Sequence, residues 1–253
     1  MIANYHTHTF RCGHAVGTDR EYVENAIKSG IKILGFSDHA PYTFEDGHIS
    51  CWRIPKEKEE DYVNSITALK EEYKNDIEIH LGYEMEYYPK EFNDMYNYVK
   101  NLKAEYLILG QHNLGETEKE FHPTPVPCDD INKLNKYTEL ITEAIKTEKF
   151  LYVAHPDIFR FTGKKEIFYN ALLKIANTAK EYNMPLEINF LGIRDNRHYP
   201  SATFFEACRD SGCKVIFGAD AHDPKDLVRK EDIEKAEKIV KDYNLNLVET
   251  LKI

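Results

Sequence analysis

Histidine dominates the chemistry that this 253-residue sequence could perform. The chain has 11 histidines, and seven of them, together with two carboxylates, each follow a short run of apolar and branched residues. Imidazole nitrogens and carboxylate oxygens are ligands that zinc, iron and manganese accept. The nine candidate metal ligands are His6, His8, His14, His39, Glu84, His112, His155, Asp220 and His222.

Two motifs place a pair of these ligands two residues apart. His6 and His8 lie in NYHTHT, and Asp220 and His222 lie in GADAH. Alternate residues of an extended strand point to the same side, so both members of a pair can reach one ion. One H-x-H pair is weak evidence, because this histidine content produces such a pair by chance about half the time. The metal-site prediction therefore depends on all nine residues together.

The short runs before these ligands are predicted to be parallel strands, because they alternate with long amphipathic stretches typical of β-α units. Seven strands are expected, at residues 2–5, 33–36, 77–83, 106–109, 151–154, 185–189 and 214–218, with 245–248 as an irregular or edge strand. Helices are expected at about residues 19–29, 55–73, 91–102, 129–147, 165–182, 201–211 and 230–243.

This alternation predicts an α/β fold, a distorted (β/α)7 TIM-like barrel in which residues 1–253 form a single domain. In such a barrel the carboxyl ends of all strands face one mouth, where functional side chains converge. The nine ligands would then form one site. The loops at 41–54 and 115–127 are too polar and proline-rich for a core, so we expect them to act as lids or walls over that site.

Composition narrows the classes of function. The formal net charge of -10 and the interleaving of lysine with glutamate disfavour nucleic-acid binding. No apolar run approaches the roughly 18 residues that span a bilayer, and no signal-peptide profile is present, so we expect no membrane contact and a cytoplasmic location. The five cysteines are scattered without a C-x-x-C pair, which favours an open catalytic metal site over a structural zinc site.

Seven motifs occur in a fixed order along essentially the whole chain. They are NYHTHTFRCGHA, SDHAP, GYEMEY, GQHN, AHPD, EINFLGIR with the following HYPS, and GADAH. In order and number they resemble the PHP (polymerase and histidinol phosphatase) family, and within it the monofunctional histidinol-phosphate phosphatases. The resemblance implies a distorted barrel of seven β/α units that holds three divalent metal ions, either Zn, Fe or Mn.

The resemblance also divides the nine ligands among three metals. The implied sets are His6, His8, Glu84 and Asp220 for the first metal, the bridging Glu84 with His112 and His155 for the second, and His14, His39 and His222 for the third. Through these metals, Glu84, Asp220 and His222 are the expected catalytic residues.

The implied activity is hydrolysis of L-histidinol phosphate to L-histidinol and phosphate in histidine biosynthesis, by attack of a metal-bridging hydroxide. The residues themselves support a broader activity, the metal-assisted hydrolysis of a small phosphomonoester. Three alternatives stay open: a PHP-type phosphoesterase acting on another phosphomonoester or a nucleotide, a non-catalytic metal-binding module, and a metal-dependent amidohydrolase on a related barrel.

Arginines near the ligands are candidates for phosphate binding, because a guanidinium group donates two parallel hydrogen bonds to phosphate. The expected substrate-binding residues are Arg160, Arg194, Arg197, His198 and Ser201. Of the arginines we favour Arg160 and Arg197.

Carboxylates are candidates for two further roles. The amine and imidazole of histidinol would need acidic partners, and the two long loops offer Asp46, Glu116 and Glu120. Asp38, Asp157 and Asp223 adjoin predicted ligands, so they are interpreted either as acceptors that orient imidazoles or as surface and capping residues. Glu86 is interpreted as a surface carboxylate.

Overall fold

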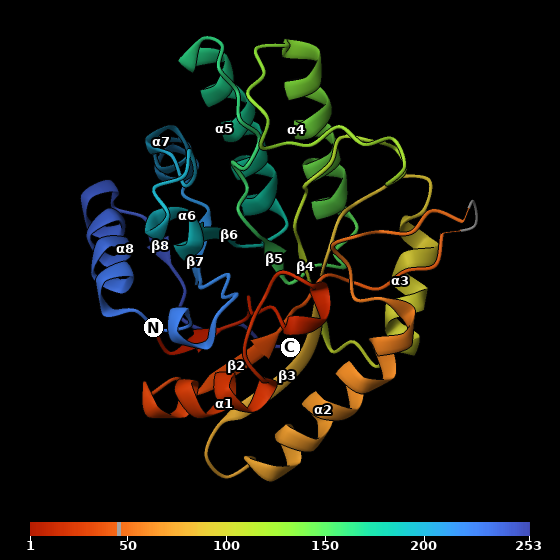
Figure 1. Cartoon of the computed structure of the whole chain (residues 1–253). Helices are drawn as coiled ribbons and strands as arrows, with labels where there is room; N and C mark the ends of the chain where they lie inside the picture. The colour runs from red at the N-terminus through yellow and green to blue at the C-terminus, as the bar shows by residue number, and fades with distance from the viewer. Residues whose placement is uncertain (45–46) are drawn as a thin grey trace.

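Eight parallel strands, hydrogen-bonded in sequence order from β1 to β8, form the centre of the computed structural model, which describes residues 1–44 and 47–253 (Figure 1). The strands are β1 Ala3–Asn4, β2 Ile33–Phe36, β3 Glu78–Met85, β4 Tyr106–Leu109, β5 Tyr152–Val153, β6 Leu186–Asn189, β7 Lys214–Gly218 and β8 Asn246–Leu247. All seven predicted strands are present. The additional segment near residue 246 pairs only with the beginning of β7 among the described residues.

Helices follow the strands as predicted, with one addition. They are α1 Asp19–Lys28, α2 Glu59–Glu72, α3 Phe92–Asn101, α4 Ile131–Lys146, α5 Lys165–Glu181, α6 Phe190–Arg194, α7 Ala202–Ser211 and α8 Lys230–Tyr243, with 3-10 turns η1 Phe10–Cys12, η2 Lys56–Lys58 and η3 Pro224–Asp226. The short α6 was not predicted. It follows β6 directly, and the side chain of Asn189 caps it by accepting a hydrogen bond from Gly192 N.

The barrel closes at the mouth by a contact between the extensions of β1 and β7. Thr7 and Ala221 form a parallel bridge, in which His8 N donates to Ala221 O at 3.0 Å and Ala221 N donates to His6 O at 3.3 Å. Beside the mouth the ring therefore consists of seven strands, as a (β/α)7 barrel requires. The eighth strand extends the sheet at the opposite end, where β7 begins.

Large tyrosines contribute to a small hydrophobic cluster formed by alternate residues of β1, β4, β5, β7 and their extensions. Its members are Ala3, Tyr5, Tyr106, Ile108, Tyr152, Ala154 and Ile216. The hydroxyl of Tyr106 donates to the carbonyl oxygens of Tyr5 and Phe36 at 2.8 and 3.0 Å. A Cβ at Gly35 would lie 2.2 Å from that hydroxyl, so the absence of a side chain in β2 makes room for the ring.

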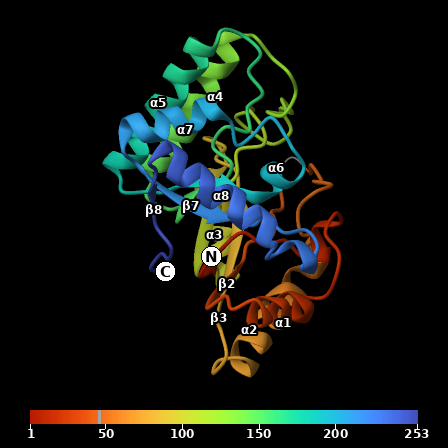
Figure 2. The same cartoon turned by 90° about the vertical axis from the view of Figure 1, so that its left-hand side faces the viewer.

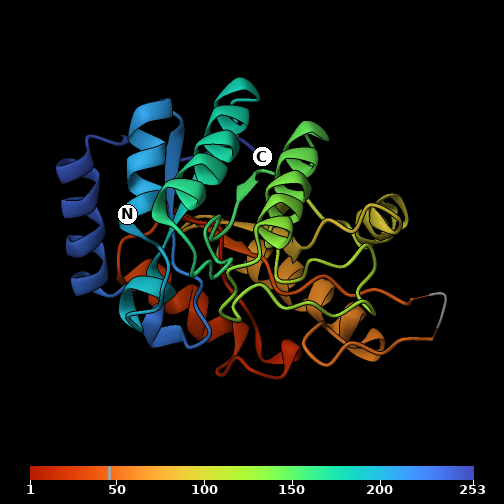
Figure 3. The same cartoon turned by 90° about the horizontal axis from the view of Figure 1, so that it is seen from above.

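A second and larger hydrophobic cluster lies between the strands and the helices. Helices α4, α5, α7 and α8 form a row along one side of the sheet, with α5 packed against both α4 and α7 (Figure 2). Seen from above, the helices surround the strands (Figure 3). No described helix combines the length and apolar character needed to cross a membrane.

The hydroxyl of Tyr5 joins β1 to the segment after β8. It donates to Leu251 O at 3.1 Å and accepts from Leu251 N at 2.9 Å. We expect Tyr5→Phe to lower the free energy of unfolding by about 1–2 kcal/mol, because two backbone groups lose their partner. Urea denaturation measures the change, and Tyr169→Phe, which removes a hydroxyl bonded to exposed Asp210, is the control. Equal stability of Tyr5→Phe and wild type would contradict this role.

Candidate metal centre

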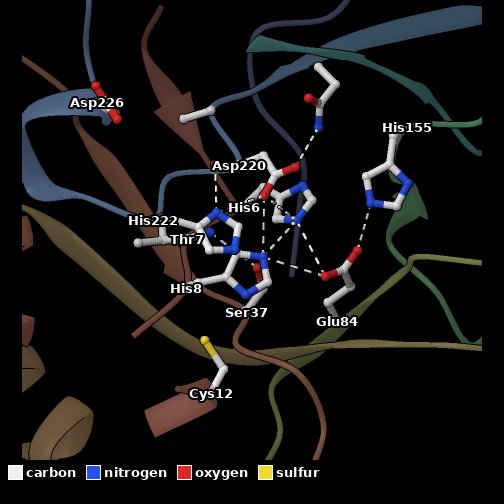
Figure 4. A network of polar contacts seen from close by, with 12 residues as sticks. His6, Thr7, His8, Cys12, Ser37, Glu84, His155, Asp220, His222 and Asp226 are labelled. Atoms are coloured by element: carbon white, nitrogen blue, oxygen red, sulfur yellow. Dashed lines mark hydrogen bonds and ion pairs between the residues drawn. The ribbon is translucent and has the colours of Figure 1, made fainter. Parts of the chain in front are cut away.

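The carboxylate of Glu84 is the centre of a cluster at the barrel mouth. Glu84 is the penultimate residue of β3, whereas it was predicted to follow a strand that ends at residue 83. Its oxygens lie close to ring nitrogens of five histidines, at 3.6 Å from His6, 3.4 Å from His8, 3.3 Å from His39, 3.6 Å from His112 and 2.8 Å from His155. Side chains from distant parts of the chain thus converge on one carboxylate (Figure 4).

The remaining predicted ligands lie beside this carboxylate. Asp220 Oδ1 is 3.5 Å from His6 Nε2 and 3.3 Å from His8 Nε2. On the outer side of the cluster, His8, His14, His39 and His222 have donor atoms that all lie within 4.8 Å of one another. The structure therefore brings all nine predicted ligands together.

The arrangement of donor atoms in the cluster suits coordination to divalent cations better than hydrogen bonding among the side chains themselves. His6 Nε2 and His8 Nε2 face each other at 3.2 Å. The buried Nδ1 atoms of His39 and His155 have no hydrogen-bond partner among the described residues. Buried imidazoles and carboxylates that are not fully satisfied by hydrogen bonds are costly, and coordination to cations compensates both charge and lone pairs.

The electrostatics of the cluster also favour bound positive charge. Burial alone raises the pKa of Glu84, yet His112, His6 and His39 hold that pKa well below the usual range. Burial lowers the pKa of His6, but the carboxylates of Asp220, Glu187 and Glu84 outweigh it and raise the pKa to about 10. Without metal ions, protons on histidine therefore supply the positive charge that the carboxylates require.

Two of the clustered residues have left-handed backbone conformations. His155 has a φ of 30° and Asp220 a φ of 47°, values that are uncommon for residues with a side chain. Hydrogen bonds hold both in place, because Glu187 Oε2 accepts from His155 N at 2.8 Å and Asn189 Nδ2 donates to Asp220 Oδ2 at 3.0 Å. Backbone strain of this kind is typical of functional sites.

Glu187, in β6, is a site residue that the sequence reasoning missed. It is fully buried, and its Oε1 lies 2.8 Å from His6 Nδ1, where it orients the imidazole. Glycines accommodate the buried carboxylates, because a Cβ at Gly218 would lie 1.7 Å from Glu187 and one at Gly110 would lie 1.9 Å from Glu84. The sequence feature that could have revealed Glu187 is the occurrence of a glutamate inside the predicted strand PLEIN.

Glu86 is not a surface residue, and that interpretation was wrong. It is fully buried, and its Oε1 accepts from His112 Nδ1 at 2.8 Å. Asp38 has the predicted orienting position, with Oδ1 3.4 Å from His8 Nδ1. Asp223 instead caps η3 and pairs with Lys225 at 2.8 Å, and Asp157 accepts from Ser201 N at 2.6 Å. Of the three aspartates, only Asp38 faces a clustered imidazole.

A cavity of about 850 Å³ opens onto the cluster. Both long loops line it, as predicted, through Trp52 from the first loop and Phe121, Pro123 and Pro125 from the second. The rings of Trp52 and Phe121 lie 5.5 Å apart between centroids. The loops therefore meet over the site and give its outer part an aromatic wall.

The predicted substrate-binding residues separate into two groups. Arg160, Arg197 and His198 line the cavity, and Arg197 also bonds to Asp195 and the Tyr199 hydroxyl. Arg194 and Ser201 are not among the lining residues. The unpredicted helix α6 directs Arg194 toward Asp226 and Asp232, at 3.7 and 3.9 Å, and Ser201 is the N-cap of α7.

Two of the three loop carboxylates proposed for the amine and imidazole, Glu116 and Glu120, are not found on the cavity wall. Glu116 pairs with Lys90 at 2.6 Å and Lys136 at 3.7 Å, and Glu120 accepts from Glu116 N at 3.2 Å. Neither is among the residues that line the cavity. Asp46 lies outside the described residues.

Comparisons with known proteins identify a family and a fold. The PHP domain model matches residues 4–190. The Deinococcus radiodurans protein named "Probable histidinol-phosphatase" is 26% identical, over 89% of this chain and 88% of that protein. Histidinol-phosphatase of Bacillus subtilis is also 26% identical, over 88% and 94%. The fold is similar to that of Lactococcus lactis histidinol phosphate phosphatase, solved with zinc, L-histidinol and phosphate, with a TM-score of 0.73 at 19% identity, covering 99% of this chain and 96% of that one.

Asp157 allows a test of the electrostatics beside the cluster. Burial raises its pKa to about 7, and Oδ1 has no hydrogen-bond partner among the described residues. Because this pKa exceeds the value of about 3.9 in an unfolded chain, the native state binds the proton more tightly, and stability is lost as pH rises from about 4 to about 7.

In the metal-free protein, Asp157→Asn should remove this loss. As the pH rises from 5 to 8, the difference in free energy of unfolding between variant and wild type should shift by about 1–3 kcal/mol in favour of the variant. Urea denaturation at both pH values measures it, with exposed Asp129→Asn as the control. A difference that does not change with pH would show that Asp157 is not held protonated.

Proposed function

The chain belongs to the PHP domain family, and from that membership we propose that it is a metal-dependent histidinol-phosphatase, which hydrolyses L-histidinol phosphate to L-histidinol and inorganic phosphate. One observation carries the proposal. Eight of the nine donors, all but the buried His6, line a cavity with Arg160 and Arg197 on its wall, so a phosphate group can contact cations and guanidinium groups at once.

Three metal ions are assigned to the nine donors. His6, His8, Glu84 and Asp220 would hold the first, Glu84 with His112 and His155 the second, and His14, His39 and His222 the third. When bound, such ions activate water as a nucleophile and neutralise charge on the phosphoryl oxygens. Zinc, iron and manganese all suit this ligand set.

The protein's own side chains prepare these donors for cations. Glu187 accepts from the Nδ1 position of His6, and Glu86 does so from His112, which leaves Nε2 of each ring free toward Glu84. Two carboxylates therefore fix both the orientation and the tautomer of two predicted ligands. Because they are buried, solvent does not compete for these hydrogen bonds.

Phosphate binding is assigned to Arg160 first and Arg197 second. The guanidinium of Arg160 has no hydrogen bond or ion pair among the described residues, so its donors are available to a ligand. Arg197 is held by Asp195 and Tyr199, which fixes its position at the wall. The organic part of the substrate would then occupy the outer cavity, where Trp52 and Phe121 offer aromatic faces to an imidazole ring.

Metal removal and substrate choice test the proposal together. Purified protein should contain zinc, iron or manganese and release phosphate from L-histidinol phosphate. A chelator should abolish turnover and added metal should restore it, because no described side chain can replace the activated water. A marked preference for nucleotides over L-histidinol phosphate would overturn the proposed substrate. Metal-replete protein that turns over no phosphomonoester would favour the non-catalytic alternative. The cytoplasmic location stays a prediction.

Arg160→Met tests the phosphate assignment. We expect KM for L-histidinol phosphate to increase by about 10- to 100-fold, because a charge-assisted hydrogen bond contributes about 1.5–3 kcal/mol. Metal content should not change, since Arg160 lies outside the donor cluster. Arg209→Met, which removes an exposed guanidinium paired with Asp210, is the matched control. Unchanged KM in Arg160→Met would exclude Arg160 from phosphate binding.

A further inference from the structure

Arg53 is a buried guanidinium on the first long loop that contacts three separate parts of the site. Only 4% of the residue is exposed. Its Nη2 donates to Glu86, its Nη1 donates to Ala40 O at 2.9 Å, and its Nε donates to Glu118. Each nitrogen of the group therefore bonds a different segment.

Two of these contacts act on predicted metal ligands. Glu86, held by Arg53, accepts from His112 Nδ1 at 2.8 Å. Ala40 directly follows His39, and a second backbone contact nearby, from Ile54 N to His39 O at 3.2 Å, fixes the same stretch. His39 and His112 share one donor group with Glu84, in which all ligand atoms lie within 4.8 Å. Arg53 thus supports two of the three members of that group.

The third contact acts on the wall of the cavity. Glu118 belongs to the second long loop, three residues before Phe121, and it is 1% exposed. Trp52 immediately precedes Arg53 and packs on Phe121 with 5.5 Å between ring centroids. The ion pair between Arg53 and Glu118 therefore joins the two loops next to their aromatic contact.

An arginine is required for this combination of partners. Its planar group presents donors in fixed directions, whereas lysine has one flexible ammonium group that cannot bond three partners arranged around a plane. Both carboxylates are buried, and the Arg53 guanidinium forms an ion pair with each of them. Moving the guanidinium away from one partner consequently strains its contact with the others.

We propose that Arg53 is a positioning residue that couples the His39–Glu84–His112 donor group to the Trp52–Phe121 wall, so that metal binding at the donor group positions the wall of the substrate pocket. The inference rests on the proposed function for the identity of the ligand that the wall encloses. The coupling itself requires only that the donor group binds a divalent cation.

Trp52 gives a direct readout, because it is the only tryptophan of the chain. Zn²⁺ is titrated into metal-free protein while tryptophan emission is recorded and bound zinc is measured. Wild type should show a change in emission that follows zinc uptake. Arg53→Lys and Glu86→Gln should lose at least half of that change, and Glu86→Gln should weaken zinc retention about 10- to 100-fold because a neutral amide is a weaker acceptor for His112 and for Arg53 than the carboxylate.

Glu118→Gln separates the two sides of the network. It should retain zinc like wild type but lose the emission change. KM for L-histidinol phosphate should increase about tenfold, while the inhibition constant for inorganic phosphate should stay within twofold of the wild-type value. Arg20→Lys, an exposed guanidinium bonded to Glu72, is the control and should behave as wild type. If Arg53→Lys does not fold, Glu86→Gln and Glu118→Gln still test the coupling, because both should lose the emission change and only Glu86→Gln should lose zinc.

Normal emission change and normal zinc retention in folded Arg53→Lys would overturn the proposal, as would a uniform loss of thermal stability with no change in either readout. The zinc titration involves no substrate. Wild-type protein that shows the coupled emission change but fails to hydrolyse L-histidinol phosphate would therefore disprove the proposed substrate and leave the coupling standing.

Discussion

The structure depends on one electrostatic constraint, the burial of the Glu84 carboxylate among five imidazoles. In a medium of low dielectric constant such a group is stable only if positive charge lies beside it. The histidines lie at the ends of different strands, so formation of the barrel brings their ring nitrogens close to the Glu84 carboxylate. Surrounding carboxylates orient these rings, and Gly110 leaves the space that Glu84 occupies.

The sequence predicted the ligand cluster because strand periodicity and strand ends obey simple rules. His6 and His8 occupy alternate positions, and each later ligand follows an apolar run, so a parallel barrel must bring them to one mouth. The supporting carboxylates were harder to identify. Glu86 and Glu187 bear the same side chain as many exposed glutamates, and only the tertiary structure shows that their partners are His112 and His6.

The substrate wall was predicted only in outline, because side-chain direction there depends on irregular backbone. Both long loops were expected over the site, yet Trp52 and Phe121 line the cavity in place of Glu116 and Glu120. The short helix α6 explains the difference among the arginines. Its turn directs Arg194 toward acidic residues of the following segments, and Arg197, beyond the helix end, reaches the cavity.

Closure of the barrel has a consequence for how the site comes into being. Thr7 meets Ala221, and the Tyr5 hydroxyl bonds to a backbone group 246 residues away. Contacts between such distant segments form late, because the chain must first lose the entropy of a very long loop. His6 and His8 consequently find Asp220 and His222 only after the strands between them have assembled into the barrel. Full assembly of the cation cluster thus waits for closure of the barrel, which ties cation acquisition to a late stage of folding.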